Sequence, residues 1–572
     1  MTSPTRAEQP RKLRVIACEP CRSRRTRCDG RKPRCGSCET RRSVCEYPEA
    51  NKRTATNVED ELSQIRSQLD RIERAVASVE FTRRRDVGSI SEAATSPWAA
   101  HAGASSVSAS PELLDARGFP YMKLQTCAFT RLAGLGENYG NDVIRLERAA
   151  HPISTSTGGL FVLNHPKAMA ALQSFSVKIH PWYPILESRF SECISSVLAN
   201  SFERRTDTFL VLMVLASGSI AQENTYAEAL ERRPDAMYLN LALDMLQVVI
   251  LEQSLRSVQC LVAASIHYCL LLKPLQAHDL AAMAIKKAQD LHITGAFQDD
   301  QVAYEHWIRV YRIALLIEGE LVIPLRLVDS NAWETEEEIP LPTGTDIWSF
   351  EEDSDMDESV ERSRSDNVVT YLLAEISMRR ILRRNTAAIT VSTEGKADYA
   401  PLIAQELEDQ VARWYSFLPV PLRFSLEPDD LDADTSDPII FLRTQYWACM
   451  VSFYWPAVVK VMDSQQLSES TMNGCRSYFH SYRQFIDSAT RALDVCVPNK
   501  WTIYASIFAI SIGAHLGASN ALLAPLASRQ TWDMLALARD AFGEECQQSP
   551  SLSVMAESMR KTLSAFPEVW HN

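Results

Sequence analysis

The sequence has little of what would place it in a fibrous, disulfide-held or disordered class. Its 572 residues include only 19 glycines and 14 cysteines, too few for a collagen-like chain or a disulfide scaffold. Hydrophobic residues make up 46% and charged residues 23%, a balance that excludes a chain disordered throughout. At ~100 to 200 residues per domain, the length predicts several folded units.

Targeting and membrane signals are scarce as well. Residues 1–14 are polar and basic and contain no apolar run before a small-residue cleavage site, so we do not expect secretion. Residues 501–528 contain no Asp, Glu, Lys or Arg and are long enough to cross a bilayer. Their interspersed Ser, Asn, His and Pro would be poorly paired in hydrocarbon, so we predict a buried helix and no membrane partner.

Catalytic signatures are missing too. The sequence contains no GxSxG nucleophile elbow, P-loop, HExxH helix or dinucleotide-binding fingerprint, and its 11 histidines are dispersed. We therefore expect no catalytic residues and no enzyme activity. An enzymatic or metabolite-binding body stays open as an alternative, which turnover or ligand-dependent melting would reveal.

The charge that is present is segregated. Residues 1–57 contain fifteen Lys and Arg against six Asp and Glu, a net charge of +9. The whole chain has a net charge of −13, which leaves −22 for residues 58–572. A basic head on an acidic body indicates a module that binds a polyanion. Acidic runs at 334–338, 351–358 and 427–437 are typical of solvated loops, and the alternative is contact with basic partners or with the basic head.

Composition predicts six segments. Residues 1–17 form a basic tail, 18–45 a cysteine cluster, 46–57 a linker, 58–82 a coiled coil, 83–120 a disordered linker and 121–572 a large all-α body. In the body, residues 237–251, 254–272, 276–291 and 304–323 repeat apolar residues at helical spacing. Pro234, Pro274 and Pro324 mark the ends of these segments.

A heptad pattern predicts a short parallel coiled coil. Seven apolar residues follow one another in alternating steps of four and three over three heptads. They are Val58, Leu62, Ile65, Leu69, Ile72, Val76 and Val79. Leucine at a with isoleucine at d favours higher oligomers in model coiled coils, but three heptads are short.

Six cysteines repeat one spacing twice, a CxxC pair followed six residues later by a third cysteine. They are Cys18, Cys21, Cys28, Cys35, Cys38 and Cys45. Thiolates favour tetrahedral zinc, and six thiolates fill the eight coordination places of two ions if two of them bridge. We predict two structural Zn²⁺ ions per chain. A single-zinc ribbon would leave Cys28 and Cys45 idle, and disulfides would need an oxidising compartment.

Basic residues crowd the first half of this cluster. Four arginines fall within six residues, and fork-shaped guanidinium groups match phosphate oxygens or the O6/N7 edge of guanine. The candidate DNA contacts are Arg22, Arg24, Arg25, Arg27, Arg31, Lys32 and Arg34. Double-stranded DNA is the expected partner, and a solvated basic face or an import signal is the alternative.

Residues 18–45 resemble, at every ligand position, the Zn₂Cys₆ binuclear cluster of fungal transcription factors. The resemblance implies that Cys18 and Cys35 bridge the two metals. It places Pro33 where the family has a loop proline, often with a cis bond. It also implies that Arg24 and Arg25 read CGG triplets in the major groove, although the family often has lysine at the position of Arg25. The remaining ligands would be divided as Cys21 and Cys28 on one zinc, and Cys38 and Cys45 on the other.

The body resembles the fungal-specific transcription factor regulatory domain at several points. Residues 180–186, HPWYPIL, are similar to its opening motif, and residues 257–259, Tyr268, 284–292 and 317–321 to its later helices. The resemblance implies an all-α domain that controls activation, in some members through a small effector. Trp307, Tyr311 and Met283 are expected in its core.

These observations together predict a nuclear, zinc-dependent regulator of transcription by RNA polymerase II. We expect a homodimer on paired CGG-like triplets, and activation, with transcription coactivators as possible partners. The fold class is a small Zn₂Cys₆ module, a short parallel coiled coil and a large all-α regulatory domain. A repressor or a heterodimer partner is the alternative.

Overall fold

The chain forms two compact units, residues 1–108 and residues 109–572. The computed structural model describes residues 18–24, 26, 28, 29, 31–45, 127–149, 163–199, 202–325, 327–333, 339–344, 346–350, 358–391, 399–426, 437–495 and 498–563. Within these ranges every regular element is helical and none is a β-strand. The basic tail, both linkers, the coiled coil from Val58 to Val79 and nearly all of the three acidic runs lie outside the described residues.

Among its described residues, the first unit has two short helices with the same design. Helix α1 (Glu19–Ser23) follows Cys18 and α2 (Gly36–Thr40) follows Cys35, and each cysteine occupies the extended N-cap position. The Lys32–Pro33 peptide bond between the helices is cis. The buried cluster of this unit consists of Cys18, Cys21, Cys35 and Cys38, so sulfur takes the place of a hydrocarbon core.

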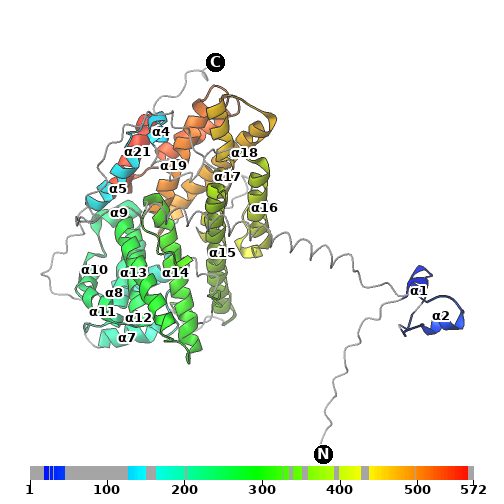
Figure 1. Ribbon diagram of the computed structural model, residues 1–572. Helices are drawn as coiled ribbons and strands as arrows, with labels where there is room; N and C mark the ends of the chain where they lie inside the picture. The colour runs from blue at the N-terminus through cyan, green and yellow to red at the C-terminus, as the bar shows by residue number, and fades with distance from the viewer. Residues whose placement is uncertain are drawn as a thin grey trace, which may run out of the picture. The chain divides into compact units, whose positions relative to one another are not determined.

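The body is a helical assembly that we divide into an N-terminal half and a C-terminal half (Figure 1). The N-terminal half contains α4 (Cys127–Leu132), α5 (Tyr139–Ala149), α6 (His165–Lys178), α7 (Phe190–Ala199), α8 (Thr206–Gln222), α9 (Tyr226–Arg232), α10 (Ala236–Leu243), α11 (Leu246–Leu251), α12 (Leu255–Leu270), α13 (Pro274–Ile293) and α14 (Gln301–Leu325). The C-terminal half contains α15 (Glu358–Val391), α16 (Pro401–Phe417), η3 (Val420–Leu422), α17 (Asp437–Ser464), α18 (Glu469–Val495), α19 (Lys500–Ser519), α20 (Arg529–Asp540), η4 (Glu544–Gln548) and α21 (Pro550–Thr562).

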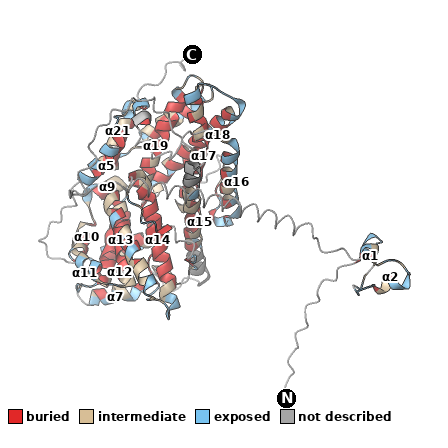
Figure 2. Ribbon diagram, viewed as in Figure 1, coloured by how far each residue is buried: buried red, intermediate tan, exposed pale blue. Residues whose placement is uncertain are grey.

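Two helices of the N-terminal half are almost entirely buried. Helix α8 is buried on all sides from Thr208 to Ala221, and it packs against α6, α10 and α12. Gly218 permits the approach of α6, because a Cβ there would overlap the Ala171 carbonyl oxygen. Helix α14 is buried from Glu305 onward, and Figure 2 shows it as a nearly continuous red element. Its buried residues include charged side chains, among them Arg309 and Glu320, as well as apolar ones, so α14 can form polar contacts inside the body.

The C-terminal half is built around the antiparallel pair α17 and α18, which a short loop connects. Helix α19 packs against this pair and against α14. It is long and apolar enough to cross a bilayer, but 72% of its most apolar window is buried inside the protein. The prediction of a buried helix here is therefore confirmed. One hydrophobic cluster extends from Phe129 to Leu563 and joins both halves.

Three details differ from the sequence predictions. The segment 237–251 forms two helices, because the chain breaks after α10 and the freed Asp244 carbonyl accepts a hydrogen bond from Arg204. Pro324 lies inside the last turn of α14, where its missing N–H removes one helical bond. Trp307 and Tyr311 are fully buried as expected, but Met283 is 37% exposed because it lies on the outer face of α13.

Candidate metal centre and nucleic-acid interface

The cysteine side chains of the first unit lie in one cluster. The Sγ atom of Cys18 lies 3.6 Å from that of Cys35, 3.7 Å from that of Cys38 and 3.8 Å from that of Cys28. The Sγ atoms of Cys21 and Cys35 are also 3.6 Å apart. A tetrahedral zinc with Zn–S bonds of about 2.3 Å has S–S edges of about 3.8 Å, whereas a disulfide needs about 2 Å. The spacing therefore fits sulfur atoms that surround metal ions.

The cluster divides into two overlapping groups of four ligands. The Sγ atoms of each group all lie within 4.8 Å of one another. Cys18 and Cys35 belong to both groups, and both are fully buried. The groups are Cys18, Cys21, Cys28 and Cys35, and Cys18, Cys35, Cys38 and Cys45. Because every donor is a thiol and two are shared, the residues fit a pair of structural zinc ions and leave no position for a reactive water.

Local sequence explains why the ligands converge. In each CxxC pair the first cysteine caps a helix and the second lies three residues later, one turn along the same face. The Cys35 amide donates a hydrogen bond to the Cys45 sulfur at 3.3 Å, a contact that orients the ligand and stabilises its thiolate form. The repeated spacing therefore produces two groups of metal ligands with the same local geometry.

The surface of this unit is strongly basic. Residues 18–45 contain nine Lys and Arg against three Asp and Glu, a net charge of +6. Five of the predicted DNA contacts are exposed, namely Arg22, Arg24, Arg31, Lys32 and Arg34. The other two, Arg25 and Arg27, lie outside the described residues. Arg22 lies in the last turn of α1 and Arg24 is its C-cap, so these cations stand at the C-terminal end of this helix.

Sequence reasoning missed three polar residues of this unit. Arg41 and Arg42 are exposed at the end of α2 and add two cations to the surface. The Asp29 carboxylate accepts a hydrogen bond from the Gly36 amide at 3.1 Å, which caps α2 from the loop. Two features of the sequence could have revealed these residues. The internal repeat places basic residues after each helix, which points to Arg41 and Arg42, and a short acidic side chain directly before Gly30 points to Asp29 as a turn residue.

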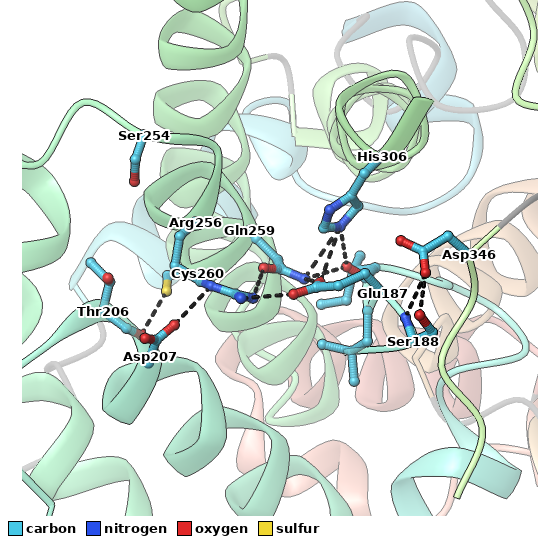
Figure 3. Close-up of polar contacts among 12 residues, drawn as sticks. Glu187, Ser188, Thr206, Asp207, Ser254, Arg256, Gln259, Cys260, His306 and Asp346 are labelled. Carbon is cyan, nitrogen blue, oxygen red and sulfur yellow. Dashed lines mark hydrogen bonds and ion pairs between the residues drawn. The ribbon is translucent and has the colours of Figure 1, made fainter. Parts of the chain in front are cut away.

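A second group of polar residues fixes the HPWYPIL segment in the body (Figure 3). The Glu187 carboxylate, 8% exposed, lies 2.7 Å from the Arg256 guanidinium and accepts a hydrogen bond from Gln259 at 2.8 Å. Arg256 also contacts Asp207 at the start of α8, at 2.9 Å. The Gln259 amide donates to the Ile185 carbonyl at 2.6 Å. Two of the segments with family resemblance, 180–186 and 257–259, therefore meet in one network.

Helix α14 completes this network. His306 Nε2 lies 3.0 Å from the Ile185 carbonyl oxygen, and Arg309 donates to the Asp346 carbonyl at 2.9 Å. Burial lowers the pKa of His306 to about 4, so its imidazole is neutral near pH 7 and the carbonyl contact assigns the proton to Nε2. Burial opposes ionisation of Glu187, but the Arg256 cation and the hydrogen bond from Gln259 favour the carboxylate, and its pKa lies below the usual value. The network therefore contains charged side chains inside the protein, and each of them has a partner of opposite charge or a hydrogen-bond partner.

Three further buried side chains follow the hydrogen-bond order of a hydrolase triad. Ser217 Oγ lies 3.1 Å from His267 Nδ1, and His267 Nε2 lies 3.1 Å from an Asp235 carboxylate oxygen. Arg233 contacts the same carboxylate at 2.7 Å. Ser217 is 1% exposed and the other two triad residues are fully buried, so no substrate carbonyl reaches the hydroxyl. The trio joins α8, α12 and the N-cap of α10 and does not form an active site.

Comparisons with known proteins support both parts of the chain. The model of the fungal Zn(2)-Cys(6) binuclear cluster domain matches residues 16–54, and that of the fungal specific transcription factor domain matches residues 172–313. An Aspergillus rugulosus protein named "Putative transcription factor ecdB" is 31% identical over 583 aligned residues, which cover 97% of this chain and 98% of that protein. No solved structure matches the chain.

Proposed function

This chain belongs to the fungal Zn(2)-Cys(6) transcription factors, which bind DNA through a module with two zinc ions, and on that premise we propose the details of its action. It acts as a homodimer in the nucleus, reads paired CGG-like triplets and activates transcription by RNA polymerase II. The observation that carries this proposal is the pair of overlapping four-thiol groups beside exposed arginines at the end of α1.

The ligand assignment follows from the shared members of the two groups. Cys18 and Cys35 are the bridging thiolates, because each belongs to both four-ligand groups. The two sets of non-bridging ligands are Cys21 with Cys28, and Cys38 with Cys45. Their fixed geometry holds α1 rigid, and a rigid helix end can present arginines to base edges in the major groove.

Dimerisation is proposed from sequence and from the statistics of DNA recognition. A single base triplet is too short to be specific in a genome, so a useful reader needs two modules at a set spacing. The heptad residues from Val58 to Val79 would supply the second module through a parallel coiled coil. The acidic runs, with their interspersed apolar residues, are the candidate surfaces for coactivators. A reporter carrying paired CGG sites distinguishes activation, which raises its output, from repression.

In vitro selection of DNA sites by the full-length zinc-loaded protein tests this function. Recovery of two CGG-like triplets at one spacing, lost on chelation of zinc, is the expected result. Recovery of single triplets would support DNA reading by the zinc module but would contradict the proposed dimer. No enrichment in the presence of zinc would contradict sequence-specific reading altogether.

Arg25→Ala is expected to weaken binding to the selected site by about 1 to 3 kcal/mol and to relax its preference at guanine. The reason is that arginine binds guanine O6 and N7 through two hydrogen bonds. The measurement is affinity for matched and guanine-substituted sites at one salt concentration. Arg53→Ala, beyond the cysteine cluster, is the control for loss of one positive charge. Equal weakening on all sequences would make Arg25 a phosphate contact instead.

A double variant, Ile65→Asp with Leu69→Asp, is expected to give a monomer that no longer binds paired sites cooperatively. Two carboxylates at the a and d positions would place unpaired charge in the seam of the coiled coil. Sedimentation measures the mass, and footprinting measures site occupancy. Ser67→Asp with Ser78→Asp, which changes two polar positions outside the seam, is the matched control. If the variant with Ile65→Asp and Leu69→Asp remained a dimer, the dimer contact would lie outside the predicted coiled coil.

A further inference from the structure

A buried polar cluster lies between the two halves of the body, apart from the zinc module and the network around Glu187. Its members come from five places in the fold. They are Tyr183 in the HPWYPIL segment, Glu320 on α14, Glu375 and Arg379 on α15, Gln445 on α17 and Asn499, the N-cap of α19. Helix α14 packs against both α15 and α19, and Figure 1 shows α14 beside α15. We call this set the seam cluster.

Hydrogen bonds and ion pairs connect its members. The Arg379 guanidinium lies 3.3 Å from a Glu320 oxygen and 3.4 Å from a Glu375 oxygen, so one cation serves both carboxylates. The Asn499 amide donates to Glu320 at 2.7 Å and to the Tyr183 hydroxyl at 2.9 Å. The Gln445 amide donates to Glu375 at 2.7 Å. The seam cluster thus joins the N-terminal half to the C-terminal half through polar contacts.

The cluster contains more acceptors and more negative charge than it can pair. Glu320 is 6% exposed and Glu375 is 2% exposed, and two buried carboxylates share one guanidinium. Glu375 Oε2, Gln445 Oε1 and Asn499 Oδ1 are buried, and none has a hydrogen-bond partner among the described residues. Buried acceptors without donors, and an unbalanced buried charge, are both unfavourable. One proton on a carboxylate would supply a donor and balance the charge at the same time.

We propose that Glu320 and Glu375 hold one proton between them at neutral pH, and that this proton stabilises the contact between the two halves of the body. The carboxyl that carries the proton becomes a donor to a neighbouring acceptor, and the other carboxylate keeps its ion pair with Arg379. Loss of the proton leaves two negative charges beside one positive charge at the seam. The seam cluster is therefore a proton-binding site that couples the two halves.

The electrostatic surroundings agree with this arrangement. Burial, the largest cause, and the neighbouring Glu375 together raise the pKa of Glu320 from 4.5 to about 7, against the opposing effects of Arg379, Asn499 and Tyr183. Burial likewise raises the pKa of Glu375, and Arg379 and Gln445 oppose the rise. The other titratable groups that face the pair are the Cys269 thiol on α12 and the Cys449 thiol on α17. Burial raises the pKa of both thiols, to about 12 for Cys449, so neither adds charge near pH 7.

A raised pKa in the folded state means that folding favours the protonated carboxyl. The stability that this proton contributes is fully present below the ordinary glutamate pKa of 4.5 and is lost as pH rises through about 7. Tryptophan fluorescence can follow the body in the full-length protein without a signal from the zinc module, because residues 18–45 contain no tryptophan. Ten of the 11 tryptophans lie in residues 109–572 and one, Trp98, lies in the first unit, so the fluorescence follows mainly the body.

The test compares Tm at about pH 5.5 and about pH 8 for the full-length protein and for Glu320→Gln, which mimics the protonated carboxyl. The expected result is a Tm that falls by several degrees in the wild type as pH rises, and a smaller fall in E320Q. Glu231→Gln, an exposed residue of α9, is the matched control and keeps the wild-type slope. Equal pH slopes in the wild type and in E320Q would overturn the proposal.

A second variant and a second measurement cover the case in which E320Q does not fold. Glu375→Gln removes the same surplus charge from the opposite side and is expected to flatten the pH slope in the same way. An infrared difference spectrum of the wild type is expected to show the carbonyl band of a buried protonated carboxyl that disappears as pH rises through about 7. Absence of this band would also overturn the shared proton, whatever the DNA-binding experiments give.

Discussion

Cys18→Ala is expected to release zinc and to abolish specific DNA binding by the full-length protein. Cys18 belongs to both four-ligand groups, so its removal leaves each ion with at most three thiolates. Structural zinc contributes roughly 10 to 16 kcal/mol to the folding of finger peptides, and the buried cluster of residues 18–45, as far as they are described, consists of cysteines that cannot replace that contribution. Loss of either ion should therefore unfold α1 and α2. Affinity for the selected site is expected to fall to the non-specific level, at least about 10³-fold.

Zinc content per chain and DNA affinity are the two measurements for this variant. Cys475→Ala, which removes a buried thiol of α18 in the body, is the matched control and is expected to retain two zinc ions and full affinity. Cys28→Ala extends the test, because Cys28 belongs to only one of the two groups. We expect it to affect one ion more than the other. Retention of specific binding by Cys18→Ala would be incompatible with a bridged pair of zinc ions.

Arg256→Gln is expected to destabilise the body by about 3 kcal/mol, because it leaves the carboxylates of Glu187 and Asp207 without their shared cation. Glu187 is nearly buried, and its remaining partners are a neutral amide and a neutral imidazole. The estimate is at the lower end for a broken buried pair, since the Arg256 side chain is 25% exposed. Denaturation by urea, followed by tryptophan fluorescence, measures the effect.

The control for this prediction is Arg232→Gln. Arg232 also contacts two carboxylates, those of Glu223 and Glu228, but its side chain is 64% exposed. Surface ion pairs contribute about 0 to 1 kcal/mol, so the expected change is small. If both variants lost the same stability, the network that holds the HPWYPIL segment would contribute no more than a surface pair. Zinc content should stay unchanged in both variants, because the zinc module is a separate compact unit.

The sequence predicted the zinc module because its information is local. All six cysteines fall within 28 residues, and their repeated spacing places each CxxC pair on one face of a helix start. Thiolate chemistry then allows few alternatives. Helix boundaries of the body also followed local signals, such as the Ser254 cap of α12 and Pro274 at the first position of α13. The break between α10 and α11 was missed, because the group that stabilises it, Arg204, lies forty residues away from Asp244.

The polar interior of the body could not be predicted in the same way. Its contacts join residues that no spacing rule connects, such as Gln259 with Glu187, 72 residues apart, and Asn499 with Glu320, 179 residues apart. From sequence, a glutamate on a helix is expected at the surface. Burial of Glu320 and Glu375 follows only from the packing of α14 against α15 and α19.

The sequence by itself therefore determined the family, the zinc ligands and the helical class, since each depends on residue type and short-range spacing. Tertiary structure alone decided that the HPWYPIL segment is fixed by the network of Arg256 and His306, and that two carboxylates meet at Arg379. The physical reason is that charge and hydrogen-bond pairing depend on distance and burial. Both quantities are set when distant helices pack together.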